Sequence, residues 1–325
     1  MKFYNSQSIP QSMREKYSDP NLIKETLTRL KTKDWSGYTT LKFGTEVNDA
    51  IGGLSIFPVT ILKGTTIYRV RSYDCVMYDC LDGVENTRLF KHLHEIGPKP
   101  EDEVKSMGRA HIPLTSVFYG STDPFAAVLE VTQWQLNSAE QMAIRDKIDS
   151  HLNRIQTVVI STWVTTEDIH MASLILNQES IGEQTFFKVH LDFVKNKLLL
   201  DCPKLTESRN LIIDFFAKEF INKSNDYKFS TFYSQMVYRH FKEELGILYS
   251  SVASDFQALN YALPKKLHNK LKFVLGEYCV AGKTEQTPSR PENTALPLSK
   301  RIFLSGPAYI CTADEDGKLI WKTAM

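Results

Sequence analysis

The sequence lacks the features that mark most membrane, secreted and zinc-binding proteins. It contains no apolar run of the roughly 18 residues that a membrane-spanning helix needs, and its opening residues, MKFYNSQSIPQSMREKYSD, include no apolar segment like that of a secretory signal. The 5 cysteines are scattered along the chain and form no C-x-x-C pair, so neither a disulfide framework nor a zinc motif is indicated. We therefore expect a cytoplasmic protein with reduced thiols, no metal and no membrane partner.

Loop motifs that bind nucleotides are also missing. Neither the P-loop pattern G-x-x-x-x-G-K-[ST] nor the dinucleotide pattern G-x-G-x-x-G occurs, so any nucleotide must be held in another way. Lysine and arginine together number 39, and aspartate and glutamate 38. This balance gives no overall attraction to nucleic acid, and we expect no direct binding to it. His92 and His94 are a close pair of histidines that we interpret as part of a solvated segment.

Helix and strand patterns follow one another irregularly along the 325 residues. Residues 1–60 predict a helical N-terminal extension, in which Asp19 caps a helix that begins at Pro20. The apolar stripe of this helix consists of Leu22, Ile23, Leu27 and Leu30. Strand patterns come next, then helices, then strands again, which favours an α+β fold over the regular alternation of a doubly wound sheet. We expect the main domain to comprise residues 61–325.

The elements expected after residue 60 are mostly short. Residues 59–64 and 65–73 form either a hairpin or two successive strands, because both are rich in branched and aromatic residues and Gly64 separates them. Residues 74–107 are polar and irregular, as in a long loop. Further strands are expected at 115–120, 155–164, 184–194, 247–251, 270–280, 300–312 and 318–322, and helices at 138–154, 209–222 and 229–246.

The segment STDPFAAVLEV predicts a helix that carries one carboxylate in an apolar setting. Thr122 or Asp123 can cap this helix, and Pro124 suits its first turn. Glu130 then lies late in the helix, on the same face as Ala126, whose small side chain allows another backbone to approach. Glu130 therefore faces either water or a ligand.

Two strands carry polar groups in unusual positions. Arg69 and Arg71 share one face of a strand, since side chains alternate, and they form either a solvated basic edge or a fork that binds a phosphate or carboxylate. Ser250 and Ser251 interrupt the apolar run GILYSSV. They are either turn residues or donors of a hydroxyl hydrogen bond to a ligand.

Taken together and in this order, these residues resemble the RES-domain family, which is named for its arginine, glutamate and serine. The resemblance is carried by IYRV, by the Gly108-Arg109 pair, and by VFYGSTDPFAAVLEV, GILYSSV and LNYAL; it covers roughly residues 60–325. It implies a catalytic group and a cofactor-binding group. The matching positions are Arg69, Glu130 and Ser251 for catalysis, with Arg69, Arg109, Tyr119, Ser251 and Asn260 for cofactor binding.

The resemblance implies an ADP-ribosyltransferase-like fold, with mixed or antiparallel sheets flanked by helices. It also implies an enzyme that consumes NAD by hydrolysis or phosphorolysis, often as a toxin restrained by a helix-turn-helix antitoxin. The chain departs from the family in two places: about 60 residues separate Arg69 from Glu130, and AHI follows Arg109 where an aromatic residue and asparagine are usual. A further tyrosine of the family corresponds to either Tyr73 or Tyr78.

A single carboxylate suits the cleavage of NAD. Nicotinamide leaves as a neutral amine and needs no acid, whereas a glycosidase normally pairs an acid with a second carboxylate. Glu130 would stabilise the oxocarbenium ion or polarise the attacking water or phosphate, Arg69 would bind the diphosphate, and Ser251 would bind the nicotinamide amide or a ribose hydroxyl. Two alternatives remain open: transfer of the ADP-ribosyl group to a macromolecule, and a catalytically silent module that binds a nucleotide or a partner.

Overall fold

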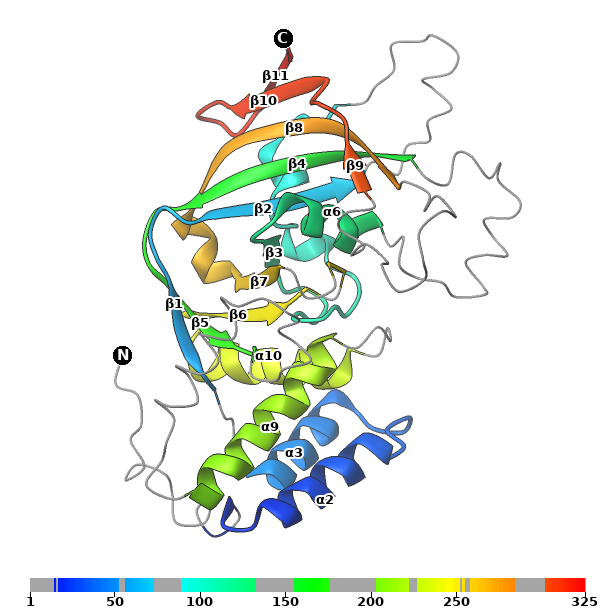
Figure 1. Ribbon diagram of the computed structural model, residues 1–325, viewed down its shortest axis with the longest axis vertical. Coiled ribbons are helices and arrows are strands. Elements are labelled where there is room, and N and C mark those ends of the chain that lie inside the picture. The colour runs from blue at the N-terminus through cyan, green and yellow to red at the C-terminus, as the bar shows by residue number, and fades with distance from the viewer. Residues whose placement is uncertain are drawn as a thin grey trace, which may run out of the picture. The chain divides into compact units, whose positions relative to one another are not determined.

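Helices and strands both contribute to this fold, and its strand pairs include antiparallel and parallel ones. The computed structural model in Figure 1 describes residues 15, 17–52, 56–72, 89–132, 155–175, 203–221, 227–251, 253–254, 258–283 and 302–324. The α+β expectation is confirmed at this level. The helix expected at 138–154 and the strand expected at 184–194 lie outside the described residues, as do Tyr73 and Tyr78.

The chain divides into two compact units. The first, here called the helical unit, joins residues 1–59, 106–113 and 170–249, and the second, the sheet unit, joins residues 60–105, 114–169 and 250–325. A division at residue 60 alone does not describe this arrangement, because the N-terminal helices pack with a helix that comes much later in the chain.

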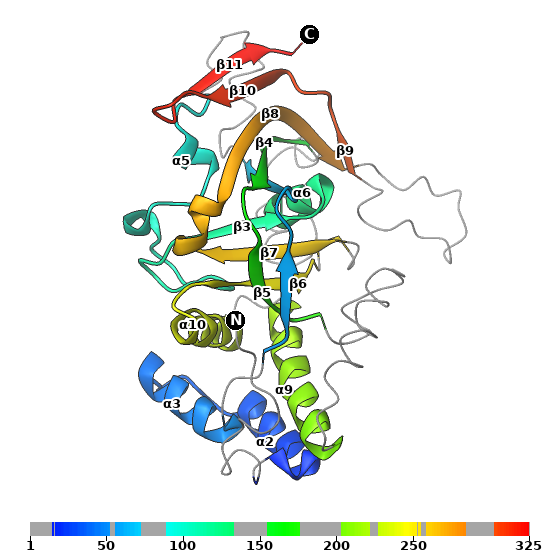
Figure 2. The same ribbon diagram turned by 90° about the vertical axis from the view of Figure 1, so that its left-hand side faces the viewer.

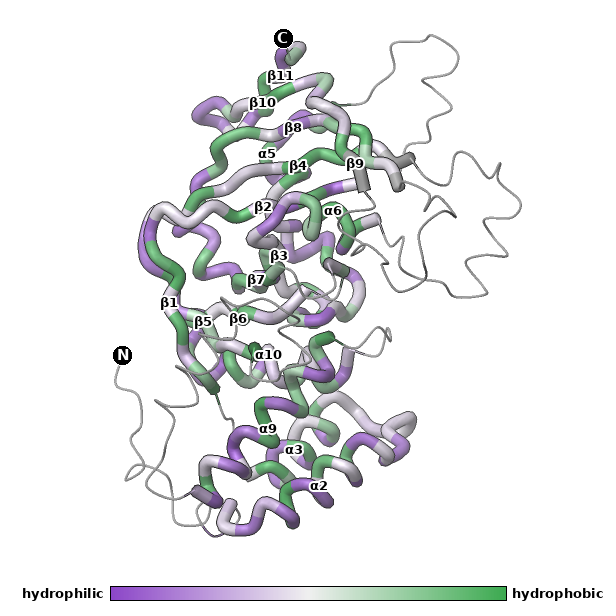
Figure 3. Tube along the Cα trace, viewed as in Figure 1, coloured by the Kyte–Doolittle hydropathy of each residue, from purple (hydrophilic) through white to green (hydrophobic). Residues whose placement is uncertain are grey.

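The described residues of the helical unit form four long helices and two strands. Its elements are α2 (Pro20–Thr32), α3 (Thr40–Ile51), α9 (Pro203–Ile221), α10 (Lys228–His240), β5 (Ile169–Ser173) and β6 (Leu245–Ser250). As predicted, Asp19 caps α2 by accepting a hydrogen bond from the Asn21 amide at 3.0 Å. Three of the four expected stripe residues of α2 are buried, but Leu22 is 48% exposed. Figure 3 shows the resulting change between apolar and polar residues along α2.

The stripe of α2 explains why the first helices do not form a separate extension. Ile23, Leu27 and Leu30 need an apolar partner, and α9 supplies it. Helix α10 ends at His240, earlier than the predicted end near Gly246, because Lys242 and Glu243 adopt left-handed backbone angles with φ of 50° and 61°. The chain then enters β6, which pairs with β5 in parallel.

The sheet unit is built on antiparallel strands in the order β7-β3-β2-β4-β8-β10-β11, with β9 also paired to β8. Their bounds are β2 Thr66–Ser72, β3 Val117–Ser121, β4 Ile155–Thr165, β7 Leu259–Pro264, β8 Leu271–Lys283, β9 Ile302–Leu304, β10 Tyr309–Ala313 and β11 Leu319–Thr323. Figure 2 shows β8 curving between β4 and β10. Strand β1 (Pro58–Ile61) lies next to β5 in the strand order, so β1 and β2 are two successive strands and not a hairpin.

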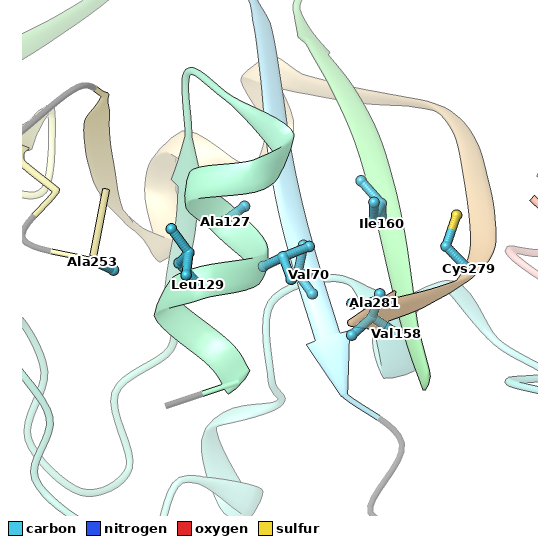
Figure 4. Close-up of a cluster of buried hydrophobic side chains, with 9 residues drawn as sticks. Val70, Ala127, Leu129, Val158, Ile160, Ala253, Cys279 and Ala281 are labelled. Carbon is cyan, nitrogen blue, oxygen red and sulfur yellow. The ribbon is translucent and has the colours of Figure 1, made fainter. Parts of the chain in front are cut away.

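One face of this sheet is covered by helix α6 (Pro124–Thr132). Val70 of β2 packs against Ala127 and Leu129 of α6, together with Val158 and Ile160 of β4 (Figure 4). Cys279 and Ala281 of β8 also belong to this core cluster. The side chains at every second position therefore point to α6, as the alternation in these strands requires.

The other face of the sheet is covered by a segment that we predicted to be an irregular loop. Helix α5 (Leu93–Ile96) places Ile96 in a core cluster with Val159 of β4 and Tyr278 of β8. A short 3-10 helix, η2 (Glu101–Glu103), follows. The polar sequence of this segment predicted a long loop, and this prediction is wrong for residues 89–105. These residues are part of the folded sheet unit.

None of the helices in the described part of the chain combines the length and apolar character needed to cross a bilayer.

Candidate functional site

Glu130 lies on α6, and the start of this helix is well defined. The Asp123 carboxylate accepts a hydrogen bond from the Ala126 amide at 2.8 Å, which caps the helix, and Pro124 is its first residue. The Asp123 amide in turn donates to the hydroxyl of Ser121, at the end of β3. Strand β3 thus passes directly into α6, and this connection fixes where the helix lies over the sheet.

The Glu130 carboxylate receives hydrogen bonds from two side chains that are distant in sequence. The Ser251 hydroxyl and the Asn260 side-chain amide each donate to Glu130 Oε1 at 2.7 Å. Ser251 is fully buried and Asn260 is 3% exposed, whereas Glu130 itself is exposed. Neither bond uses Oε2, so this oxygen can accept a hydrogen bond from a ligand or approach a developing positive charge.

Main-chain hydrogen bonds hold both donors in place. Ser251 follows β6, and its amide donates to the Ala258 carbonyl at 2.9 Å. The hydroxyl of Ser254, in the turn at residues 253–254, donates to the Ser251 carbonyl and accepts from the Ala258 amide. Asn260 lies on β7 opposite Ser121 of β3. The donors therefore come from a braced turn and from a strand within the sheet.

Arg69 lies on the opposite face of β2 from α6. Its Nε donates to the Gly97 carbonyl at 3.1 Å, and its Nη1 donates to the Tyr119 carbonyl at 2.7 Å. The guanidinium carbon is 5.2 Å from the centre of the Phe118 ring, and Arg69 is 6% exposed. Burial, and then the nearby charge of Arg71, lower the pKa of Arg69 well below its ordinary value. Arg69 joins β2, β3 and the end of α5.

The two arginines of β2 form a fork that donates hydrogen bonds to main-chain carbonyls. Arg71 Nη2 donates to the same Gly97 carbonyl, at 3.1 Å, that Arg69 binds. The arginines are therefore not a solvated edge, and their hydrogen-bond acceptors within the described residues are backbone carbonyls. Among the described residues, the buried Nε of Arg71 has no hydrogen-bond partner, and burial lowers the pKa of Arg71.

Tyr119 lies on the face of β3 that α6, the helix of Glu130, covers. Phe118 faces Arg69, so the alternation of side chains turns the half-buried Tyr119 towards the α6 face. Tyr68 is a residue of this face that the sequence reasoning missed. It pairs in register with Ser121, which pairs with Asn260, and it packs against the α6 cluster. The sequence did offer a signal: Tyr68 immediately precedes Arg69, so the two side chains point to opposite faces of β2.

Arg109 belongs to the helical unit and is held there by aromatic rings. Its guanidinium carbon is 5.7 Å from the Tyr227 ring centre and 6.0 Å from that of Tyr249. Gly108 beside it packs closely, because a Cβ at this position would come within 2.2 Å of the His111 ring and would displace that ring. The Gly108 carbonyl accepts a hydrogen bond from the Thr231 hydroxyl at 2.6 Å, which fixes the Gly108-Arg109 turn.

Of the predicted residues, the structure thus brings Glu130, Ser251 and Asn260 into direct contact and places Tyr119 on the same face of the sheet. It puts the side chain of Arg69 on the other face. No group of three or more His, Cys, Asp or Glu side chains suited to a metal occurs among the described residues. No family model matches this sequence, and no match is found among curated proteins or solved structures.

Proposed function

We propose that this protein cleaves the bond between nicotinamide and ribose in NAD, by hydrolysis or phosphorolysis. The observation that supports this proposal best is the exposed Glu130 carboxylate, which the buried side chains of Ser251 and Asn260 hold by one oxygen. An arrangement that orients one carboxylate and leaves its second oxygen accessible suits a site where charge develops on a ligand.

The reaction needs little more than this carboxylate. The C1′–N bond breaks as water or phosphate attacks the anomeric carbon, and the bonding electrons neutralise the pyridinium, so nicotinamide leaves without an added proton. When water is the nucleophile, its proton passes to the solvent. Glu130 stabilises the positive charge that develops on the ribose, or polarises the nucleophile. The proposed role of Glu130 is thus electrostatic, and no second carboxylate is required.

The resemblance to RES-domain proteins supports the same assignment, since Arg69, Glu130 and Ser251 match the family's three eponymous residues. With it we propose an ADP-ribosyltransferase-like fold and a protein inhibitor of the helix-turn-helix type as partner. Arg69 receives a different role from the one expected: it holds β3 through the Tyr119 carbonyl and so positions the strand that leads into α6. Tyr119 and Tyr68 are the aromatic residues proposed to contact the ligand.

The test compares NAD consumption by the wild-type protein and by Glu130→Gln. We expect the wild type to release nicotinamide, with ADP-ribose as coproduct in water and ADP-ribose 1″-phosphate when phosphate is supplied. Glu130→Gln should lower kcat by about a hundredfold or more with a smaller change in KM, because it removes charge that acts in the transition state. Glu25→Gln, which changes an exposed glutamate on α2, is the matched control and should keep full activity.

Equal NAD loss with the wild type and Glu130→Gln would refute the proposal. The products also separate the alternatives: label from radioactive NAD on protein or nucleic acid indicates ADP-ribosyl transfer, whereas small soluble products indicate hydrolysis or phosphorolysis. NAD that remains intact with the wild-type protein indicates a catalytically silent module.

A further inference from the structure

We propose that Asn260 is a positioning residue for Glu130, and that it acts on the reaction only through that carboxylate. This inference rests on the proposed function, and it changes the role expected for Asn260, which was direct contact with NAD. The Asn260 side-chain amide donates to Glu130 Oε1 at 2.7 Å from a side chain that is 3% exposed. A buried amide committed to the carboxylate is poorly placed to bind a ligand directly.

Two donors are needed because Glu130 is otherwise free to move. An exposed glutamate has several rotatable bonds, and ordering such a side chain costs about 1.5–2 kcal/mol. A single hydrogen bond still lets the carboxylate rotate about the bonded oxygen. A second donor on the same oxygen, from a different element, limits this rotation and defines where Oε2 points.

Of the two donors to Glu130, Asn260 is the one that lies on a strand of the sheet. Asn260 lies on β7, whose partner β3 continues through Ser121 and Asp123 into α6. The same strand pair therefore carries both the donor and the helix that bears the acceptor. Ser251, by contrast, is held in a turn that is closed by side-chain bonds of Ser254. The distance between Asn260 and α6 is thus set by the sheet itself.

Asn260→Ala and Asn260→Asp separate positioning from ligand contact. The first removes the donor, and the second replaces it with an isosteric like charge. We expect kcat to fall about tenfold or more in Asn260→Ala and further in Asn260→Asp, while the NAD dissociation constant stays within about twofold. A tenfold weaker NAD affinity with unchanged kcat would identify Asn260 as a ligand contact and overturn the inference.

The double variant Asn260→Ala with Glu130→Gln gives the sharper result. Because Asn260 acts only through the carboxylate, adding Asn260→Ala to Glu130→Gln should leave the residual rate unchanged. A further drop equal to that in the wild-type background would overturn the inference. If Asn260→Ala does not fold, as judged by its thermal transition, Asn260→Asp is used in the same cycle.

A structural measurement keeps this test separate from that of the proposed function. In a crystal structure of Asn260→Ala, the Glu130 carboxylate should leave the position it takes in the wild-type protein or occupy more than one rotamer. An unmoved carboxylate would overturn the positioning role whether or not the wild type consumes NAD. Loss of order in Glu130 combined with a wild type that leaves NAD intact would instead retain the positioning role and reject NAD cleavage.

Discussion

Glu130 and Arg69 show how the surroundings of a charged side chain separate two roles. Glu130 is exposed, yet buried neutral donors hold one of its oxygens, so the charge stays solvated while its direction is set. Arg69 is buried, and its Nε and Nη1 donate to the main-chain carbonyls of Gly97 and Tyr119. The first arrangement leaves a charged group available to a ligand, and the second uses the charge to hold two segments together.

Arg69→Lys tests this structural role of the arginine. Lysine keeps the positive charge but lacks the planar fork, so it cannot bond both carbonyls as Arg69 does. We expect the free energy of unfolding to fall by about 1.5–3 kcal/mol, the range for a hydrogen bond to a charged group. Urea unfolding followed by tryptophan fluorescence measures the change, with Lys272→Arg on β8 as an exposed control.

The opposite results would support the role predicted from sequence, in which Arg69 binds the diphosphate of NAD. Unchanged stability together with a much higher KM for NAD would show that its guanidinium contacts the diphosphate of the ligand.

At the level of elements, α6 has two functions. Its buried face, with Ala127 and Leu129, joins the main core cluster of the sheet unit, and its exposed face carries Glu130. The helix has only 9 residues, too few to be stable alone. Its position therefore depends on the sheet beneath it and on the cap at Asp123.

Asp123→Ala tests how far the cap supports the site. Loss of the bond to the Ala126 amide should lower the free energy of unfolding by about 0.5–2 kcal/mol, and the first turn of α6 should fray. We expect NAD cleavage to fall with it, because the helix carries Glu130. Asp123→Asn is the matched control, since asparagine caps helices as well as aspartate does. Chemical denaturation and turnover measured on both variants check this. Equal losses in the two variants would show that the negative charge matters and the cap does not.

On the scale of the whole molecule, we expect the half-buried His268 to make stability depend on pH. Burial lowers the pKa of His268 to about 4, although its bond to the Leu263 carbonyl works in the other direction. Of the charged groups around it, Arg69 and Lys265 lower this pKa and Glu101 raises it. The folded protein therefore holds His268 neutral in a range where the unfolded chain binds a proton.

The sign of the effect follows from this difference. Between pH 6.5, the ordinary pKa of histidine, and about pH 4, the unfolded state binds more protons, so stability falls as the pH is lowered. The loss from this one residue approaches about 3 kcal/mol at the lower end of the range. Urea unfolding at several pH values measures it. His268→Gln should flatten the dependence in this window, and an identical slope in that variant would assign it to other groups.

Much of the local structure could be predicted from short segments. Asp19 and Pro20 mark the start of α2, and Asp123 and Pro124 mark the start of α6, because caps and first turns depend on residues that are adjacent in sequence. The alternation in β4 also holds, with Val159 on one face of the sheet and its neighbours on the other.

Predictions that depend on contacts with residues distant in sequence were wrong in several places. Leu22 fits the apolar stripe of α2 but is exposed. The helical spacing of later residues predicted that α10 ends near Gly246. The helix ends earlier because Lys242 and Glu243 turn the chain. The polar segment that contains α5 seemed from its composition to be a loop, yet Ile96 is fully buried against the sheet.

The sequence by itself determined the periodicity of the elements, the caps that begin two helices and the alternation that puts Arg69 and Tyr119 on defined sides of their strands. Only the tertiary structure decided that α6 covers one face of β2 and α5 the other, and therefore that Arg69 points away from Glu130. It also decided that Ser251 and Asn260 meet one oxygen of Glu130 across 121 and 130 residues. Periodicity and capping arise from neighbours along the chain, whereas such contacts depend on the order in which the strands join the sheet.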